Sequence, residues 1–110
     1  MENNKLLFNV PTPCGFNVHT TYSYWDLITT VKHPIMQGKE LEIKETLQSP
    51  DEVRRSRVDA EIYLFYKSTD LNQFLCAVVK REINEGFLVT AYILVKLKKV
   101  IEYGPNESFL

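Results

Sequence analysis

The sequence predicts one α+β domain in which N-terminal helices pack on a small antiparallel β-meander of about four strands. Two observations carry this prediction. Apolar residues recur with helical spacing between residues 24 and 31 and strong helix formers fill residues 39–47, whereas from residue 61 onward the apolar residues follow the alternation and short continuous runs typical of strands. The chain has 110 residues, of which 45% are hydrophobic, as is usual for a single globular domain. We therefore expect residues 1–110 to fold as one domain.

The first thirteen residues are expected to form a loose N-terminal arm. Their apolar stretch, residues 6–10, is cut off by Pro11 and Pro13, and proline is tolerated only in edge strands and loops. After Gly15, residues 16–19 alternate between apolar and polar side chains. This alternation predicts a short edge strand.

Two helices and a single helical turn are expected next. The first helix begins at the capping residue Ser23 and ends before Pro34, because the proline ring cannot donate to the helical ladder. The second covers residues 39–47, which are strong helix formers. Residues 49–52, Ser-Pro-Asp-Glu, have the capping pattern of another helix start, so one further turn is predicted there.

Three strands are expected in the second half of the chain, over residues 61–66, 74–80 and 87–95. The first is rich in β-branched and aromatic residues, and the other two are nearly continuous apolar runs. Residues 84–86 form the predicted hairpin loop, with Gly86 at a position of positive φ. Consecutive strands of this kind predict a meander that the preceding helices cover on one face.

Charge and composition limit the function classes. The formal net charge of −1 argues against binding nucleic acid by overall charge, although residues 53–110 carry a net charge of +2 and residues 1–52 one of −3. The sequence contains no apolar run of about 20 residues and no signal-peptide pattern, so a cytoplasmic protein without a membrane anchor is expected. Cys14 and Cys76 are expected to be reduced thiols.

No cofactor is expected. The two cysteines and two histidines lack the spacing of a metal site, and no glycine-rich phosphate loop occurs among the four glycines. Chemistry would therefore depend on the side chains of the chain itself.

A small set of polar residues could carry that chemistry. Arg54, Arg55 and Arg57 crowd one short segment, where guanidinium groups suit phosphate binding, although a solvated basic turn is the more common reason for such a group. Lys80 ends a strand, where lysine commonly protects a sheet edge. His33 is expected at a helix C-terminus, either as a half-buried cation or as a proton donor and acceptor.

Two hydroxyl residues are predicted to share one face of the last strand. Thr90 and Tyr92 are two residues apart and so project to the same side, where they could line a polar cleft or bond within the sheet. On strict alternation, Phe87, Val89 and Ala91 would face the other side.

Three segments occur together in an order that resembles a known group of proteins. They are Lys32-His33-Pro34, the run from Pro50 to Arg57 (PDEVRRSR) and the run from Glu85 to Tyr92 (EGFLVTAY). Over about residues 16 to 100 the chain resembles small bacterial and cyanobacterial proteins of the barnase, EndoU, colicin and RelE-like nuclease group, which include phage and cyanobacterial members.

This resemblance implies a toxin-like, metal-independent ribonuclease in which the ribose 2′-hydroxyl attacks the adjacent phosphate. It implies RNA as substrate and a small acidic antitoxin-like protein as partner. The implied catalytic residues are His33 as proton donor or acceptor, Arg55 and Lys80 as phosphate stabilisers, and Tyr92 and Thr90 as groups that orient the substrate or share in proton transfer. The residues implied to bind substrate are Arg54, Arg57 and Lys67.

Two other functions fit the residues. The first is a non-catalytic binding module, a degenerate nuclease fold whose basic segment contacts RNA or a protein. The second is an immunity-like or structural protein whose acidic helix, residues 39–47, meets a basic partner.

Overall fold

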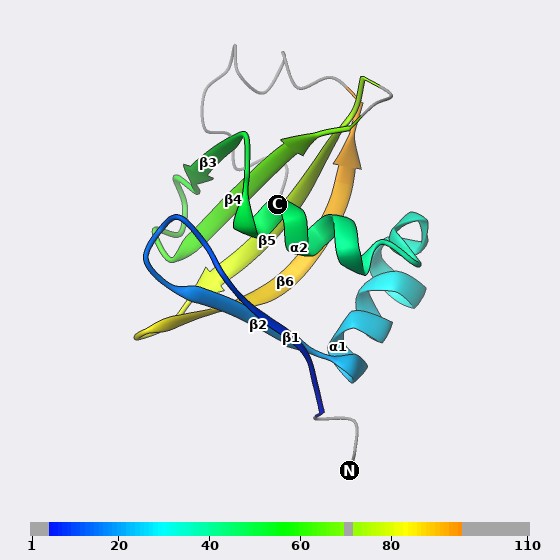
Figure 1. The fold of residues 1–110 in the computed structure, drawn as a ribbon, viewed down its shortest axis with the longest axis horizontal. Coiled ribbons are helices and arrows are strands. Elements are labelled where there is room, and N and C mark those ends of the chain that lie inside the picture. The colour runs from blue at the N-terminus through cyan, green and yellow to red at the C-terminus, as the bar shows by residue number, and fades with distance from the viewer. Residues whose placement is uncertain (1–4, 70–71, 96–110) are drawn as a thin grey trace.

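The fold is a six-stranded mixed sheet with helices packed on one face (Figure 1), as seen in the computed structural model, which describes residues 5–69 and 72–95. The strand order is β1-β2-β6-β5-β4-β3. The strands are β1 (Leu6–Pro11), β2 (Asn17–Thr21), β3 (Glu52–Arg55), β4 (Ile62–Ser68), β5 (Phe74–Arg81) and β6 (Glu85–Leu94). The helical segments are α1 (Tyr22–Leu27), the π-helical η2 (Ile28–Lys32), the 3₁₀-helical η3 (Pro34–Met36) and α2 (Glu40–Gln48).

The α+β class is thus confirmed, but the sheet is larger than the expected antiparallel meander. Neighbouring strands are antiparallel except β2 and β6, which pair in parallel over Asn17–His19 and Glu85–Phe87. This one parallel pair joins the N-terminal hairpin β1–β2 to the meander β4–β5–β6. Strand β6 lies far from β2 in the chain, so no local sequence pattern predicts their parallel pairing.

The N-terminal segment was expected to be a loose arm, but residues 6–11 form the strand β1. Phe8 and Val10 of this strand are buried in the core, which accounts for its order. Pro11 lies at the end of β1 on the edge of the sheet, where a missing N–H costs little. The predicted short strand after Gly15 is present as β2, but it lies between β1 and β6 instead of at an edge.

The first helix starts and ends differently from the sequence pattern. Its N-cap is Thr21, whose hydroxyl accepts a hydrogen bond from the Tyr24 N–H at 3.1 Å, so Ser23 is not the cap. The last turn widens into η2, where the His33 N–H donates to the Ile28 carbonyl at 2.7 Å. His33 therefore ends this helix, as predicted. The second predicted helix is confirmed as α2.

The helical turn predicted at residues 49–52 is wrong, because the chain enters the edge strand β3 at Glu52. The Asp51 carboxylate accepts a hydrogen bond from the Ser68 N–H of β4 at 2.7 Å, and the Asp51 N–H donates to the Tyr66 carbonyl at 2.7 Å. Hydrogen bonds to β4 thus engage the Asp51 carboxylate and the Asp51 N–H, which a local helical turn would otherwise have used.

The three strands of the second half are confirmed as β4, β5 and β6, but Gly86 has another role than the predicted one. Gly86 lies within β6 and does not have the positive φ expected of a loop glycine. A Cβ at this position would lie 2.7 Å from Val79 Cγ1 and 2.9 Å from Phe16 Cε1. Glycine is needed here because two core side chains press against the backbone.

The two faces of the sheet have different surroundings. The helices contribute Trp25, Ile28, Met36, Ile43 and Leu47 to a core on what we call the first face. The other face, called the second face below, carries a separate cluster of strand residues: Leu64, Tyr66, Cys76, Val78 and Tyr92. In the described ranges no helix is long and apolar enough to cross a membrane.

Candidate functional site

Thr90 and Tyr92 lie on the second face, as the sequence predicts. Thr90 pairs with Val78 and Tyr92 pairs with Cys76, and Val78, Cys76 and Tyr92 all belong to the cluster on this face. Ala91 faces the helices, also as predicted.

Phe87 and Val89 do not share the face of Ala91, so that prediction is wrong. A bulge between Val78 and Val79 shifts the register of β6, and Val89 packs against the second-face cluster. Phe87 pairs with Lys80, whose other partner, Ile62, also packs against that cluster. An extra residue in one strand reverses the alternation beyond it.

Three buried hydroxyl groups on the second face make no hydrogen bond within the described part of the chain. They belong to Tyr66, Thr90 and Tyr92, and are called the hydroxyl cluster below. Tyr66 is fully buried and Tyr92 is 9% exposed. A buried polar group without a partner costs about 1–3 kcal/mol of stability. Buried groups of this kind call for an explanation, such as an ordered water, an ion or a catalytic role.

The hydroxyls of Tyr66 and Tyr92 are hydrogen-bond donors over a wide pH range. Burial raises the pKa of each phenol well above its ordinary value, and the neighbouring Cys76 acts in the same direction. Cys76 pairs with Tyr66 on one side and Tyr92 on the other. Burial raises the pKa of the Cys76 thiol to about 12. The two phenols oppose this rise, although their polar contacts with the thiol fall short of hydrogen-bond geometry.

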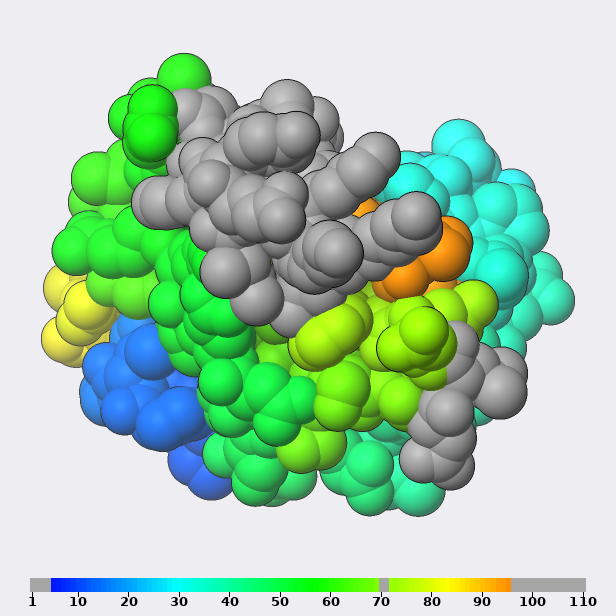
Figure 2. Space-filling model, turned by 90° about the horizontal axis from the view of Figure 1, so that it is seen from above, coloured from blue at the N-terminus to red at the C-terminus, as the bar shows by residue number. Residues whose placement is uncertain are grey.

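His33 lies against one end of the hydroxyl cluster. Its ring centroid is 5.6 Å from that of Tyr92, with the rings tilted by 47°. The next residue back, Lys32, donates from Nζ to the Val89 carbonyl of β6 at 3.1 Å and so holds η2 beside this strand. Figure 2 shows the end of β6 in orange beside the cyan helical segment. The imidazole is half-buried.

Arg54 lies at the other end of the hydroxyl cluster. It is paired with Leu64 in the sheet, and its guanidinium carbon is 6.0 Å from the centre of the Tyr66 ring. The side chain is 9% exposed and forms an ion pair with the Glu52 carboxylate. The structure therefore brings Arg54, which was predicted to position substrate, onto the same face as Thr90 and Tyr92, and His33 packs against Tyr92.

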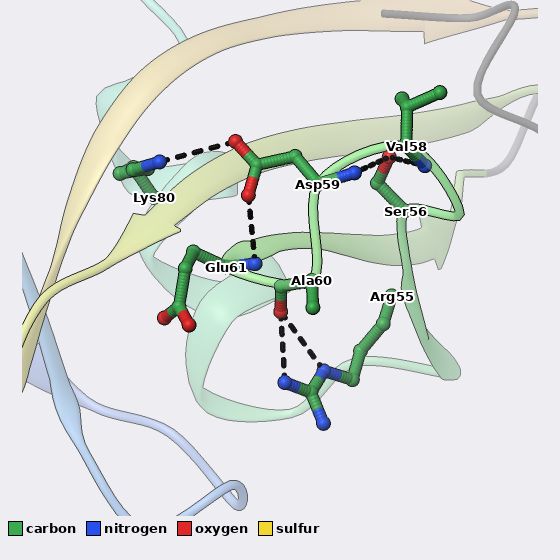
Figure 3. A network of polar contacts seen from close by, with 7 residues as sticks. All are labelled: Arg55, Ser56, Val58, Asp59, Ala60, Glu61 and Lys80. Atoms are coloured by element: carbon green, nitrogen blue, oxygen red, sulfur yellow. Dashed lines mark hydrogen bonds and ion pairs between the residues drawn. The ribbon is translucent and has the colours of Figure 1, made fainter.

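Arg55, predicted to stabilise phosphate, projects to the opposite side of the sheet. Its guanidinium lies 4.9 Å from the centre of the Tyr63 ring, and Tyr63 belongs to the core on the first face. Its Nε and one terminal nitrogen both donate to the Ala60 carbonyl, at 3.2 and 2.8 Å (Figure 3). Arg55 thus holds the turn that connects β3 and β4.

Lys80 lies on the second face and is joined to the same turn (Figure 3). Its Nζ is 3.1 Å from Asp59 Oδ2, and the other oxygen of Asp59 accepts from the Glu61 N–H at 3.0 Å. The Glu61 N–H and then Lys80 hold the pKa of Asp59 below its usual value. The Ser56 hydroxyl accepts from the N–H groups of Val58 and Asp59, which completes the turn.

The remaining two predicted residues, Lys67 and Arg57, have other surroundings. Lys67 donates to the Ser49 carbonyl at 2.7 Å and lines a cavity of about 560 Å³ between α2 and the sheet. This cavity also contains Glu42 and Glu45 of α2. Arg57 is exposed in the turn after β3.

Sequence reasoning missed Tyr66 and Cys76 as members of the site. Tyr66 lies in an apolar strand pattern, where a tyrosine is expected to be a core residue. Only its pairing with Cys76, which pairs in turn with Tyr92, shows that the three residues share a face. The described residues contain no group of His, Cys, Asp and Glu that could hold a metal ion. No protein-family model matches the chain, and no curated protein or solved structure matches it either.

Proposed function

We propose that this chain is a toxin-like ribonuclease that cleaves RNA without a metal ion, with its site on the second face of the sheet. The observation that carries the proposal is the hydroxyl cluster, flanked by His33 at Tyr92 and by Arg54 at Tyr66. Phosphate oxygens would supply the hydrogen-bond acceptors that the buried hydroxyls lack.

The proposed roles follow from the chemical groups. His33 accepts the proton of the ribose 2′-hydroxyl while the 2′-oxygen forms a bond to phosphorus. The bond to the 5′-oxygen breaks, a 2′,3′-cyclic phosphate forms, and the leaving 5′-oxygen takes a proton from solvent. Arg54 and the hydroxyls of Tyr92 and Thr90 stabilise the charge on the phosphate in the transition state.

This assignment moves the main phosphate contact from Arg55 to Arg54. Arg55 is engaged with Ala60 and Tyr63 on the far side of the sheet, whereas Arg54 shares the face of the hydroxyl cluster. Lys80 contributes positive charge on the same face while it holds the turn through Asp59. Tyr92 acts as a donor and not as a base, because burial keeps its phenol protonated.

The experiment measures cleavage of a fluorogenic single-stranded RNA by the purified protein in EDTA. We expect His33→Ala to lower the rate about 10²- to 10⁴-fold. Tyr92→Phe removes the hydroxyl alone and should also lower the rate. Tyr22→Phe is the matched control, because Tyr22 is 53% exposed on α1. A parent protein that leaves RNA intact, or His33→Ala cutting as fast as the parent, contradicts the proposal.

A non-catalytic binding module is the second candidate function. It is favoured by the carboxylate partners that Arg54 and Lys80 already have, namely Glu52 and Asp59. It predicts salt-dependent association with RNA or with an acidic antitoxin-like protein, without any product. Binding by both the parent and His33→Ala, with no cleavage by either, would favour this candidate.

A further inference from the structure

A group of three aromatic rings lies beside the proposed site. The Phe87 ring meets the Tyr24 ring edge to face at 4.9 Å and the His19 ring in the same manner at 5.3 Å. The three residues come from β6, α1 and β2, so tertiary structure alone brings them together. We call them the aromatic strip.

The aromatic strip is partly open to solvent, unlike most large aromatic side chains in the described residues. Phe8, Phe16, Phe65 and Tyr66 are all buried, whereas each member of the strip is half-buried. Half-exposed rings that support one another offer flat apolar surface to a ligand. A nucleobase is a ligand with a matching flat face.

Positive charge borders the aromatic strip. Lys32 Nζ lies 5.1 Å from the centre of the Tyr24 ring and donates to the Tyr24 hydroxyl at 3.0 Å. Lys80 is the register partner of Phe87 on the adjacent strand β5, and its ammonium group is paired with Asp59. The Glu85 carboxylate also contacts the strip, 3.6 Å from His19 Nδ1. Lysines beside exposed rings are the combination used by proteins that bind single-stranded nucleic acid.

The strip is also at a suitable distance from the proposed catalytic residues. Phe87 and Tyr92 are five positions apart on β6, which corresponds to roughly 16 Å along an extended strand. Lys32, which contacts Tyr24, directly precedes His33 in the chain. A single RNA strand of a few nucleotides could therefore place a phosphate at His33 and a base at Phe87.

Resting on the ribonuclease proposal, we infer that the aromatic strip stacks an unpaired base a few nucleotides from the cleaved phosphate. The substrate class is then single-stranded RNA. In a duplex the bases are paired and stacked on one another, so their faces are not available to Phe87. Base stacking on an aromatic side chain typically changes affinity by about 5- to 150-fold.

The experiment measures binding without turnover. In a His33→Ala background, the affinity for a fluorescent single-stranded RNA and for a hairpin of the same composition is measured by fluorescence anisotropy. We expect tighter binding of the single strand. We expect Phe87→Leu to weaken that binding about 5- to 150-fold, whereas Phe87→Tyr retains it. Tyr22→Leu is the control, because Tyr22 is exposed on α1 and makes no ring contact with the strip.

The outcomes separate the two proposals. Unchanged single-strand binding by a folded Phe87→Leu protein, or equal affinity for the hairpin, overturns the stacking inference even if the parent cleaves RNA. Ring-dependent binding by a parent protein that never cleaves RNA overturns the ribonuclease proposal and supports the aromatic strip as a binding surface. Circular dichroism and the melting temperature establish that each variant is folded.

Discussion

Arg54 and Arg55 are neighbours in β3, yet their guanidinium groups lie on opposite faces of the sheet. Arg54 lies over Tyr66 on the second face, at 6.0 Å, and Arg55 lies over Tyr63 on the first face, at 4.9 Å. The reason is the alternation of side chains along a strand. A basic segment that forms one cluster in the sequence therefore places its residues on two different faces.

Replacing each arginine by alanine should distinguish the structural role of Arg55 from the proposed role of Arg54 in cleavage. Arg55→Ala loses the hydrogen bonds to the Ala60 carbonyl, so we expect a loss of about 0.5–1.5 kcal/mol in the free energy of unfolding with cleavage nearly unchanged. Arg54→Ala should lower the cleavage rate about 10²- to 10³-fold. Urea denaturation and initial rates measure the two quantities. Loss of cleavage in a stable Arg55→Ala protein would return Arg55 to the site.

The Cys76 thiol should be almost inert to alkylation at pH 8. Its pKa is raised to about 12 by burial, so very little thiolate is present, and the side chain is fully buried. Burial also raises the pKa of Cys14, but Arg81 opposes this and Cys14 is partly exposed. Iodoacetamide followed by mass spectrometry should therefore modify Cys14 first. Denatured protein provides the control, in which both cysteines react, and faster modification of Cys76 in the native state would contradict the prediction.

Asp51 should make the protein sensitive to acid. The Ser68 N–H holds the pKa of the Asp51 carboxyl below its ordinary value. A group whose pKa is lower in the folded state stabilises the protein above its unfolded pKa, about 3.9, and this stability is lost as the pH falls through the folded pKa. Asp51→Asn should therefore be less stable than the parent at pH 7, with the difference shrinking below about pH 4. Denaturant unfolding at several pH values tests this, and a pH-independent difference would show that the charge is irrelevant.

Gly86→Ala should destabilise the protein. The added methyl group would lie 2.7 Å from Val79 Cγ1 and 2.9 Å from Phe16 Cε1, and overpacking of this kind costs about 1–3 kcal/mol. In Val79→Ala the space beside residue 86 is larger, so the same glycine substitution should cost less there. A double-mutant cycle by thermal or urea unfolding measures the coupling. Additive effects of the two substitutions would mean that the contact is relieved elsewhere.

Much of the secondary structure could be predicted because its signals are local. Helix α2 consists of strong helix formers, and β4, β5 and β6 are apolar runs between polar turns, so their positions differ from the predicted ones by only a few residues. Strand β1 and strand β3 were missed. Prolines follow the apolar residues of β1, and the capping pattern of residues 49–52 competes with β3, so in both places strand pairing outweighs the local signal.

The candidate site was predicted in part for the same reason. The spacing of Thr90 and Tyr92 placed both hydroxyls on one face, and Pro34 placed His33 at a helix end. The contact of His33 with Tyr92 and that of Arg54 with Tyr66 depend on strand order and register, which single residues do not encode.

The sequence by itself determined the α+β class, the helix α2, the three strands of the meander and the common face of Thr90 and Tyr92, because periodicity and propensity act over a few neighbouring residues. Only the tertiary structure decided the parallel pairing of β2 with β6, the separation of Arg54 from Arg55, the hydroxyl cluster and the aromatic strip. These features join residues that lie far apart in the chain, or depend on the register between strands. The separation of Arg54 from Arg55 and the hydroxyl cluster arise because the sheet buries one set of side chains beneath the helices and turns the alternate set to the second face.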